Sequence, residues 1–327
     1  MLKTYSQIIN ETLDEELKKD DSIFLIGEDI GVYGGAFGVT KGLFEKYGRQ
    51  RIIDSPMSEQ AITGLAVGAA INGLKPIVEI MFMDFVTLIY DQLMNHASIF
   101  NYLSDGKVSV PLVIRVPAGG GRGYGATHSK SLLGPLMHIP NIKIVAPSNA
   151  KEVRGLLRAS ILDKNPVIFV EHKLLYSLKE EIGEAGELED FIPLGKANIV
   201  KTGKDLLIIS FSKQVLDCVE VANKLEKEGI SIEVLDLRTI KPLDVETIKK
   251  SVEKIGKVLI VEEGYSDCGV ASEIISKINE CCFYSLSCPI KRVCTTENPI
   301  PCSSKLERET LPNIDRIESA VRGILND

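Results

Sequence analysis

The sequence lacks the cysteine spacings of a zinc site or a disulfide framework. All seven cysteines lie between Cys218 and Cys302, none forms a CxxC pair, and Cys281 and Cys282 are adjacent. An odd number of cysteines at such spacings suits neither tetrahedral zinc nor paired disulfides. We therefore expect free thiols, which fit a reducing cytoplasm.

The sequence also lacks a net positive charge and long apolar runs. The net charge is −7 and the sequence pI is near 5.4. Such a surface does not attract polyanions, so binding to nucleic acid or an anionic membrane is not expected. The longest apolar runs, such as Ile23–Ile26 and Val258–Val261, have the length of a strand, whereas a membrane-spanning helix needs roughly 20 residues. The acidic, amphipathic start of the chain has no feature of an export signal, so export is not expected.

The chain has 327 residues, more than one hydrophobic core usually serves, so two domains are expected. Strand-like runs alternate with helical patterns in both halves, which indicates βαβ units and an α/β fold. Because the strands are apolar almost throughout, the sheets should be parallel and covered by helices on both faces. The first half contains the strand-like runs SIFLIGE, KPIVEIM, VPLVIRV, IKIVAP and PVIFVEH and the helical patterns EQAITGLAVGAAING, FVTLIYDQLMNHASIF and NAKEVRGLLRASIL.

An acidic stretch divides the two domains. Glu180–Asp190 contains six acids, two glycines and no Lys or Arg, a composition that repels itself and buries little surface. We place a linker at about residues 178–195, a first domain at 1–190 and a smaller α/β domain at 196–327. Short polar residues at Asp54–Pro56 and Pro147–Asn149 predict helix starts, and a closing helix is expected near residues 313–326.

Two acids stand at positions where chemistry is common. Glu28 belongs to the sequence GED directly after a predicted strand, where open parallel sheets place their ligands. A polar strand end at an ordinary turn is the alternative. Glu59 lies in the first turn of a helix rich in Ala and Gly, where an acid also simply complements the helix dipole. The small residues of that helix suit close packing at an interface.

A glycine-dense loop, Pro117–Ser131, follows another predicted strand and carries His128. Glycines cost chain entropy, and loops rich in them occur where a ligand approaches the backbone or a lid must order. His128 is therefore a candidate proton carrier near neutral pH. A dinucleotide fingerprint is disfavoured, because Pro135 follows and no acid stands about 20 residues on. The other three histidines are expected to be structural.

The segment Ser160–Pro166 leads from a helix into a strand. A capped turn explains it, but an Asp, an Asn and helix-terminal carbonyls also offer the oxygen ligands of a group-one or group-two cation. Spacing alone favours the turn.

Taken together, several long strings resemble the beta subunits of pyruvate, acetoin and branched-chain 2-oxoacid dehydrogenases, from residue 3 to about residue 325. The resemblance implies a transketolase-like pyrimidine-binding domain and a transketolase C-terminal-like domain. It also implies two alpha and two beta chains sharing thiamine diphosphate, with Mg²⁺ on the alpha side. The strings are GEDIGVYGGAFGVTKGL, DSPMSEQAITGLAVGAAINGLKPIVEI, FMDF, VPLVIR, THS, VAPSNAKEVRGLL, DKNPVIFVEHKLLY and VLDLRTIKPLD.

The same resemblance implies roles for individual residues. Glu59 would hydrogen-bond the aminopyrimidine ring nitrogen, with Glu28 as the second acid. Met57 and Phe85 would be apolar contacts, and His128 would act near the thiazolium in acyl transfer to lipoyl. A potassium site is implied as well, which replaces the capped turn as our expectation. Its residues would be Leu112, Ser160, Ile161, Asp163 and Asn165.

Two features separate this chain from simpler alternatives. The diphosphate signature GDG followed by an Asn is missing, since Asp105–Gly106 is only a superficial echo. That absence agrees with a partner alpha chain and speaks against a self-contained transketolase. A non-catalytic scaffold remains the alternative, although Glu59 and His128 are retained.

The substrate stays open between acetoin, pyruvate and branched-chain oxoacids. The second domain would help form the dimer and dock the acyltransferase core, by analogy alone. Lys130 stands where the family usually has Gln, and an inward-facing cation there would disfavour the imidazolium form of His128.

Overall fold

The computed structural model describes residues 2–182 and 190–326, and it divides into two compact units. Unit 1 comprises Met1–Ala118 and His138–Leu194, and unit 2 comprises Gly119–Met137 and Gly195–Asp327. Most of the acidic segment predicted to be a linker lies at 183–189, outside the described residues. The glycine-dense loop, which the sequence places within the first domain, packs within unit 2.

Unit 1 is built on a parallel sheet whose strands follow the order β6-β7-β5-β4-β2-β3. In register, Gly27 at the end of β2 pairs with Glu79 of β4, and Ala118 of β5 pairs with His172 of β7. The carboxyl ends of these strands therefore meet at one edge. The strands are β2 (Ile23–Gly27), β3 (Ile52–Asp54), β4 (Lys75–Glu79), β5 (Val113–Ala118), β6 (Lys143–Val145) and β7 (Val167–His172), and β1 (Leu2–Thr4) pairs separately with β8 (Lys179–Glu181).

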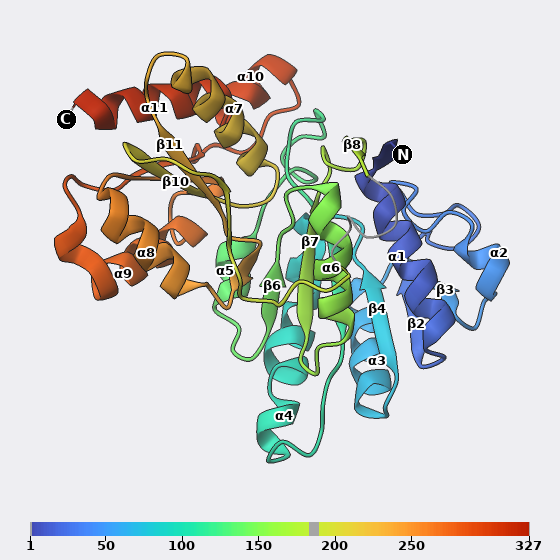
Figure 1. The fold of residues 1–327 in the computed structure, drawn as a ribbon. Coiled ribbons are helices and arrows are strands. Elements are labelled where there is room, and N and C mark those ends of the chain that lie inside the picture. Colours follow the sequence, from blue (N-terminus) through green and yellow to red (C-terminus); the bar gives the residue numbers. More distant parts are fainter. Residues whose placement is uncertain (1, 183–189, 327) are drawn as a thin grey trace. The chain divides into compact units, whose positions relative to one another are not determined.

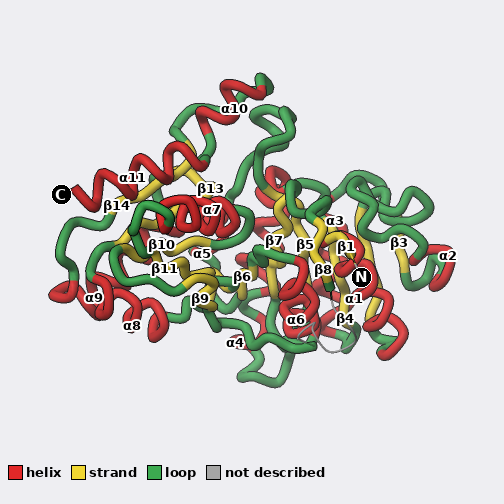
Figure 2. The backbone as a smooth tube through the Cα atoms, turned by 45° about the horizontal axis from the view of Figure 1, so that its top comes forward, coloured by secondary structure: helices red, strands yellow, loops and turns green. Residues whose placement is uncertain are grey.

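Helices cover both faces of the unit 1 sheet, as the apolar strands require. Helices α1 (Tyr5–Lys19) and α6 (Ala150–Ile161) pack side by side over one face, and α3 (Glu59–Ile71) lies over the other with the segments that follow β4 (Figures 1 and 2). Every residue of β2, β5 and β7 is buried. A short helix, α2 (Leu43–Tyr47), precedes β3.

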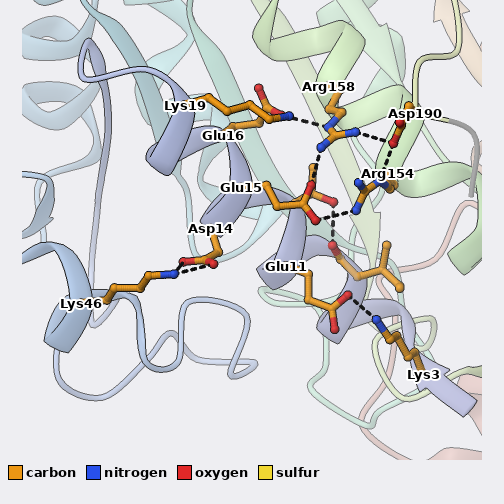
Figure 3. A network of polar contacts seen from close by, with 12 residues as sticks. Lys3, Glu11, Asp14, Glu15, Glu16, Lys19, Lys46, Arg154, Arg158 and Asp190 are labelled. Atoms are coloured by element: carbon orange, nitrogen blue, oxygen red, sulfur yellow. Dashed lines mark hydrogen bonds and ion pairs between the residues drawn. The ribbon is translucent and has the colours of Figure 1, made fainter. Parts of the chain in front are cut away.

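Ion pairs join α1 to α6 (Figure 3). Arg158 donates to the buried Glu16 at 2.9 Å, and Arg154 donates to Glu15 at 2.8 Å. Both arginines also contact Asp190, and Arg158 contacts Glu15. Because one guanidinium binds several carboxylates, this network fixes the two helices more firmly than isolated surface pairs would.

The segment FVTLIYDQLMNHASIF, for which the sequence predicts a helical pattern, is helical over most of its length but is not a regular α-helix. The segment forms a 3-10 helix η1 (Met83–Ile89), a π-helix η2 (Gln92–Ala97) and a short α4 (Phe100–Leu103). Its beginning is rich in aromatic and β-branched residues, which lose rotamer freedom in an α-helix. Packing of η1 and η2 against α3 therefore decides the local geometry.

A buried charge cluster lies in the unit 1 sheet. The Arg115 side chain is fully buried and forms two hydrogen bonds of 2.7 Å to Glu171. It also contacts Glu79, while the Tyr176 hydroxyl donates to Glu171 at 2.7 Å. Each charged group is thus desolvated but paired, as buried charges must be.

Unit 2 has a sheet in the order β14-β13-β10-β11-β9, in which only the edge strand β9 is antiparallel to its neighbour. Helices α7 and α11 share a core over one face, and α8 packs with α9 over the other (Figures 1 and 2). The elements are α5 (Leu133–Met137), β9 (Asn198–Lys201), β10 (Leu206–Ser210), α7 (Gln214–Glu226), β11 (Ile232–Asp236), β12 (Thr239–Lys241), α8 (Val245–Ile255), β13 (Val258–Tyr265), α9 (Val270–Cys282), η3 (Phe283–Ser285), β14 (Lys291–Thr295), α10 (Ser304–Thr310) and α11 (Ile314–Asn326).

The two units confirm the predicted α/β class, with mostly parallel sheets covered on both faces. The closing helix predicted near residues 313–326 is α11. Among the helices of the described residues, none is both long and apolar enough to cross a membrane.

Candidate functional site

Glu28 lies at the carboxyl end of β2, on the edge where the unit 1 strands end together. Its side chain is buried, with 7% of its surface exposed. One carboxylate oxygen accepts a hydrogen bond of 3.3 Å from the backbone N–H of Ser58. The next residue, Asp29, has a positive φ of 56° and turns the chain away from the sheet. Glu28 is thereby placed at the start of α3.

The start of α3 differs from the prediction at Asp54–Pro56. The N-cap is Ser58, whose side chain makes no capping hydrogen bond. Glu28, from another element, instead accepts from the N–H of Ser58 itself, a contact that local sequence could not have located. By contrast, Asn149 caps α6 as predicted, accepting from the N–H of Glu152 at 3.0 Å.

Glu59 is the first residue of α3 and is half-buried. Within the described residues its carboxylate makes no hydrogen bond, and its electrostatic influence falls on Glu28. Burial raises the pKa of Glu28, and the neighbouring Glu59 carboxylate raises it further. The structure therefore brings two predicted acids together at one helix terminus, where one of them is biased to hold a proton.

Met57 and Phe85 differ in their surroundings. Met57, just before the N-cap, is 87% exposed. Phe85 is half-buried in η1, and its ring packs edge-to-face on Phe82 at 6.1 Å between centroids. Phe82 in turn packs on Phe37, which stacks on Tyr176 of the buried charge cluster. Phe85 is thus held by an aromatic chain, whereas Met57 presents an apolar side chain to the surface.

The outward side of α3 carries small and apolar residues. Ala61, Gly64, Leu65 and Gly68 are all exposed, and Leu65 is 55% exposed. An exposed leucine among residues without bulky side chains leaves the helix backbone open to close packing. This surface agrees with the expected interface.

His128 belongs to unit 2, on the glycine-dense loop. The ring is half-buried, and its Nδ1 lies 2.9 Å from the hydroxyl of Thr127. Its backbone N–H donates to the carbonyl of Gly125 at 3.2 Å, which closes a tight turn. The carbonyl of Lys130 accepts from the N–H of Gly119 at 3.4 Å, across the base of the loop.

The residues predicted to bind potassium gather where α6 ends and β7 begins. Ser160 donates from its hydroxyl to the carbonyl of Leu156, and Asp163 accepts from the N–H of Asn165 at 2.9 Å. The other Asp163 oxygen pairs with Lys143, so the carboxylate is already neutralised. The carbonyl of Leu112 accepts from the N–H of Val167 at 2.8 Å, which leaves a second lone pair. Ile161 is buried at the end of α6. The cluster is rich in oxygen and nearly neutral, which suits a monovalent cation better than a divalent one.

Two carboxylates that the sequence did not single out contact the glycine-dense loop. Glu263 accepts from the N–H of Gly120, and Glu307 accepts from those of Gly121 and Gly123. Glu263 is the second of two acids, Glu262 and Glu263, that follow the apolar run Val258–Val261 in β13, and acids after a buried strand were the available signal. For Glu307, which lies 184 residues beyond Gly123, the sequence held no signal.

Within the described ranges, no group of three or more His, Cys, Asp and Glu residues is arranged to hold a metal ion. The seven cysteines are free thiols, as predicted.

Comparisons with known families match both units. Residues 2–179 match the family described as "Transketolase, pyrimidine binding domain", and residues 195–317 match "Transketolase, C-terminal domain". A solved structure described as "Split gene transketolase, inactive beta4 tetramer" has a TM-score of 0.79 at 20% identity and covers 98% of each chain. At that identity the likeness concerns the fold.

Relatives of known name are considerably closer. "Pyruvate dehydrogenase E1 component subunit beta" of Porphyra purpurea is 45% identical over 313 residues, covering 96% of this chain and 94% of the relative. A mitochondrial relative of the same type from Dictyostelium discoideum is 41% identical over 322 residues, covering 98% and 90%. "Acetoin:2,6-dichlorophenolindophenol oxidoreductase subunit beta" of Cupriavidus necator is 41% identical over 324 residues, covering 96% and 95%.

Proposed function

The chain belongs to the family of transketolase-like beta subunits of pyruvate and acetoin dehydrogenases, and we propose that with an alpha subunit it cleaves a 2-oxoacid or acetoin on thiamine diphosphate. The acyl group would pass to a lipoyl group. The observation that carries the proposal is the Glu28–Glu59 pair at the start of α3, where the pKa of the buried Glu28 is raised.

The residues at this edge of the sheet fit the pyrimidine half of the cofactor. Bound thiamine diphosphate supplies an acidic thiazolium carbon that adds to carbonyl groups. The Glu59 carboxyl, half-buried and without a hydrogen bond among the described residues, would bind the aminopyrimidine ring nitrogen and exchange a proton there. Glu28 would hold a neighbouring proton because its charged form is disfavoured. Phe85 would pack on the ring face, and Met57 would contribute an apolar edge.

His128 would act at the reacting end of the substrate. Its Nδ1 lies 2.9 Å from the hydroxyl of Thr127, and the imidazole would donate or accept a proton during acyl transfer to lipoyl.

A potassium ion would be held by Leu112, Ser160, Ile161, Asp163 and Asn165. Hydroxyl and backbone carbonyl oxygens would provide most of its ligands, because Lys143 already neutralises the Asp163 carboxylate. The ion would hold the end of α6 and the start of β7 together.

The partner would be an alpha subunit that carries the diphosphate-Mg²⁺ motif missing from this sequence. Beta-subunit names among the relatives imply such a partner. We further propose an assembly of two alpha and two beta chains that docks on a dihydrolipoyl acyltransferase core. The exposed Met57 and the small-residue side of α3 supply surface for chain contacts. Seven free thiols support a reducing compartment such as the cytoplasm.

Substitution of Glu59 in the reconstituted alpha–beta pair tests the mechanism. Glu59→Gln should slow deuterium exchange at the thiazolium carbon and overall turnover, on the order of a hundredfold or more. Glu45→Gln is the matched control, since Glu45 also lies in the first turn of a helix but is exposed. Unchanged exchange in Glu59→Gln would remove Glu59 from the mechanism.

Turnover of the wild-type pair with pyruvate, acetoin and branched-chain oxoacids identifies the substrate. A wild-type pair that binds thiamine diphosphate but turns over none of these substrates would favour the scaffold alternative.

A further inference from the structure

Backbone amides of the glycine-dense loop point at buried carboxylates. Gly121 donates to one oxygen of Glu307 at 2.8 Å, and Gly123 donates to the other at 2.9 Å. Gly120 donates to Glu263 at 2.6 Å. Three N–H groups within four residues thus bind two side-chain anions, all inside unit 2. The arrangement resembles the backbone nests that bind free anions, but here the anions belong to the protein.

The same loop meets the segment around α10 so closely that side chains would not fit. A Cβ on Gly120 would lie 2.7 Å from Cδ1 of Leu311, and one on Gly125 would lie 2.5 Å from Sγ of Cys302. Gly121, Gly123 and Gly125 also have φ values of 89°, 71° and 76°, which side chains disfavour. The glycines therefore serve close contact with residues 302–311 as well as backbone conformation.

The buried carboxylate of Glu307 needs the loop amides as hydrogen-bond donors, and those amides need the carboxylate as their acceptor. Only 2% of its surface is exposed, so its charge needs hydrogen-bond donors within the protein. Hydrogen bonds from N–H groups to a carboxylate are stronger than neutral ones, and losing one partner leaves the other unsatisfied. Both oxygens are satisfied by loop amides. This mutual requirement selects one loop conformation.

We propose that Glu307, assisted by Glu263, is a positioning residue that holds the glycine-dense loop in the conformation that presents His128. We call the hydrogen bonds of Gly120, Gly121 and Gly123 to Glu263 and Glu307 the clamp. Gly125 connects the clamp to the histidine. Its backbone lies against Cys302, and its carbonyl accepts from the N–H of His128 at 3.2 Å. Glu307 touches no reacting atom and acts through the loop. The catalytic consequence rests on the proposed function, whereas the clamp itself concerns this chain alone.

Trypsin provides a test of the clamp without any activity measurement. Arg122 is exposed and stands between the two glycines that Glu307 binds. In the full chain the bond after Arg122 should resist trypsin, and Glu307→Gln should speed its cleavage about tenfold or more, because one charged acceptor is lost. Glu309→Gln, an exposed acid on the same helix, is the control and should change nothing. Equal cleavage in wild type and Glu307→Gln would overturn the proposal.

Hydrogen exchange of the wild-type chain tests the clamp even if the variant does not fold. The amides of Gly120, Gly121 and Gly123 should exchange at least a hundredfold more slowly than in an unstructured peptide. Exchange at the unstructured rate would contradict the clamp.

Activity of the reconstituted pair separates positioning from general damage. Glu307→Gln should lower lipoyl-dependent turnover about tenfold, while deuterium exchange at the thiazolium carbon, assigned to Glu59, stays at the wild-type rate. Loss of both activities together would indicate structural damage and contradict a positioning role. If the wild-type pair showed no deuterium exchange at the thiazolium carbon while the loop amides still exchanged slowly, the proposed function would fail and the clamp would stand.

Discussion

Burial raises the pKa of Glu28, and the carboxylate of Glu59 beside it raises that pKa further. Two ionised acids at one helix start repel each other, which makes the free energy of folding less favourable unless one of them holds a proton. An ordinary helix cap has no such repulsion. Such pairs are expected where a proton must be exchanged, because a neighbouring like charge raises the pKa of a buried carboxyl such as that of Glu28.

Glu28→Gln should therefore stabilise the fold at neutral pH and weaken catalysis. A raised pKa means that the stabilising contribution of Glu28 is complete below its unfolded value of 4.5 and declines as pH rises through the folded pKa. Gln does not ionise, so the difference in unfolding midpoint between Glu28→Gln and the wild type should grow as pH rises above about 4.5 and through the folded pKa of Glu28. Thermal unfolding across that range measures it. A difference independent of pH would contradict this assignment, and Glu45→Gln serves as the control.

A second pH dependence of the free energy of unfolding is expected from Glu262, in unit 2. Burial raises its pKa from 4.5 to about 7, although the N–H of Val270 donates to it at 2.9 Å. Its contribution is complete below about pH 4.5 and lost by about pH 7, which corresponds to on the order of 3 kcal/mol. Glu262→Gln should therefore raise the free energy of unfolding at about pH 8 and change it little at about pH 4.5. Urea unfolding of the variant and the wild type at both pH values measures the two differences in free energy. A larger gain at the acidic pH would show that the sign is wrong.

Arg115 is the position where loss of one charge should damage the fold most. Arg115→Met would leave Glu79 and Glu171 buried without their common partner, which typically costs about 3–5 kcal/mol. Burial already raises the pKa of Glu79, so protonation should recover part of the loss at acidic pH. The measurement is urea unfolding at neutral and acidic pH. Arg49→Met, at an exposed arginine, is the control. A loss below about 1 kcal/mol would mean that the arginine is not needed to balance the cluster.

The sequence predicts elements whose residues agree with one another along the chain. The buried strands β2, β5 and β7 are continuous apolar runs, and Asn149 caps α6 from within its own segment. Local pattern suffices in these cases because the stabilising groups are close in sequence.

Long-range contacts are what the sequence could not provide. The N–H of Ser58, the N-cap of α3, is bound by Glu28, 30 residues earlier, and the loop before His128 is held by Glu307, 184 residues after Gly123. The helical segment between β4 and β5, which changes from 3-10 to π geometry, likewise packs against α3. In each case a tertiary partner overrides or replaces the local signal.

The dependence of the unfolding midpoint on potassium tests the proposed potassium site. The charges of Asp163 and Lys143 decide the outcome. Their side chains form an ion pair, so the oxygens around them must bind any further cation with little net charge. A bound ion stabilises the folded state by mass action, about 2.7 kcal/mol at a hundred times its dissociation constant. The unfolding midpoint should therefore be higher in KCl than in choline chloride at equal ionic strength.

Removing the competing charge should strengthen potassium binding, whereas removing the carboxylate should abolish it. Lys143→Met frees Asp163 and should shift the KCl titration of the unfolding midpoint to lower concentration, about threefold to tenfold, since Lys143 is partly exposed and its field is screened. Asp163→Asn leaves Lys143 as an uncompensated cation beside the same oxygens and should remove the difference between KCl and choline chloride. Opposite responses from the two halves of one ion pair are hard to obtain from general destabilisation, because either substitution breaks the pair. Equal midpoints in KCl and choline chloride for all three proteins would exclude the potassium site.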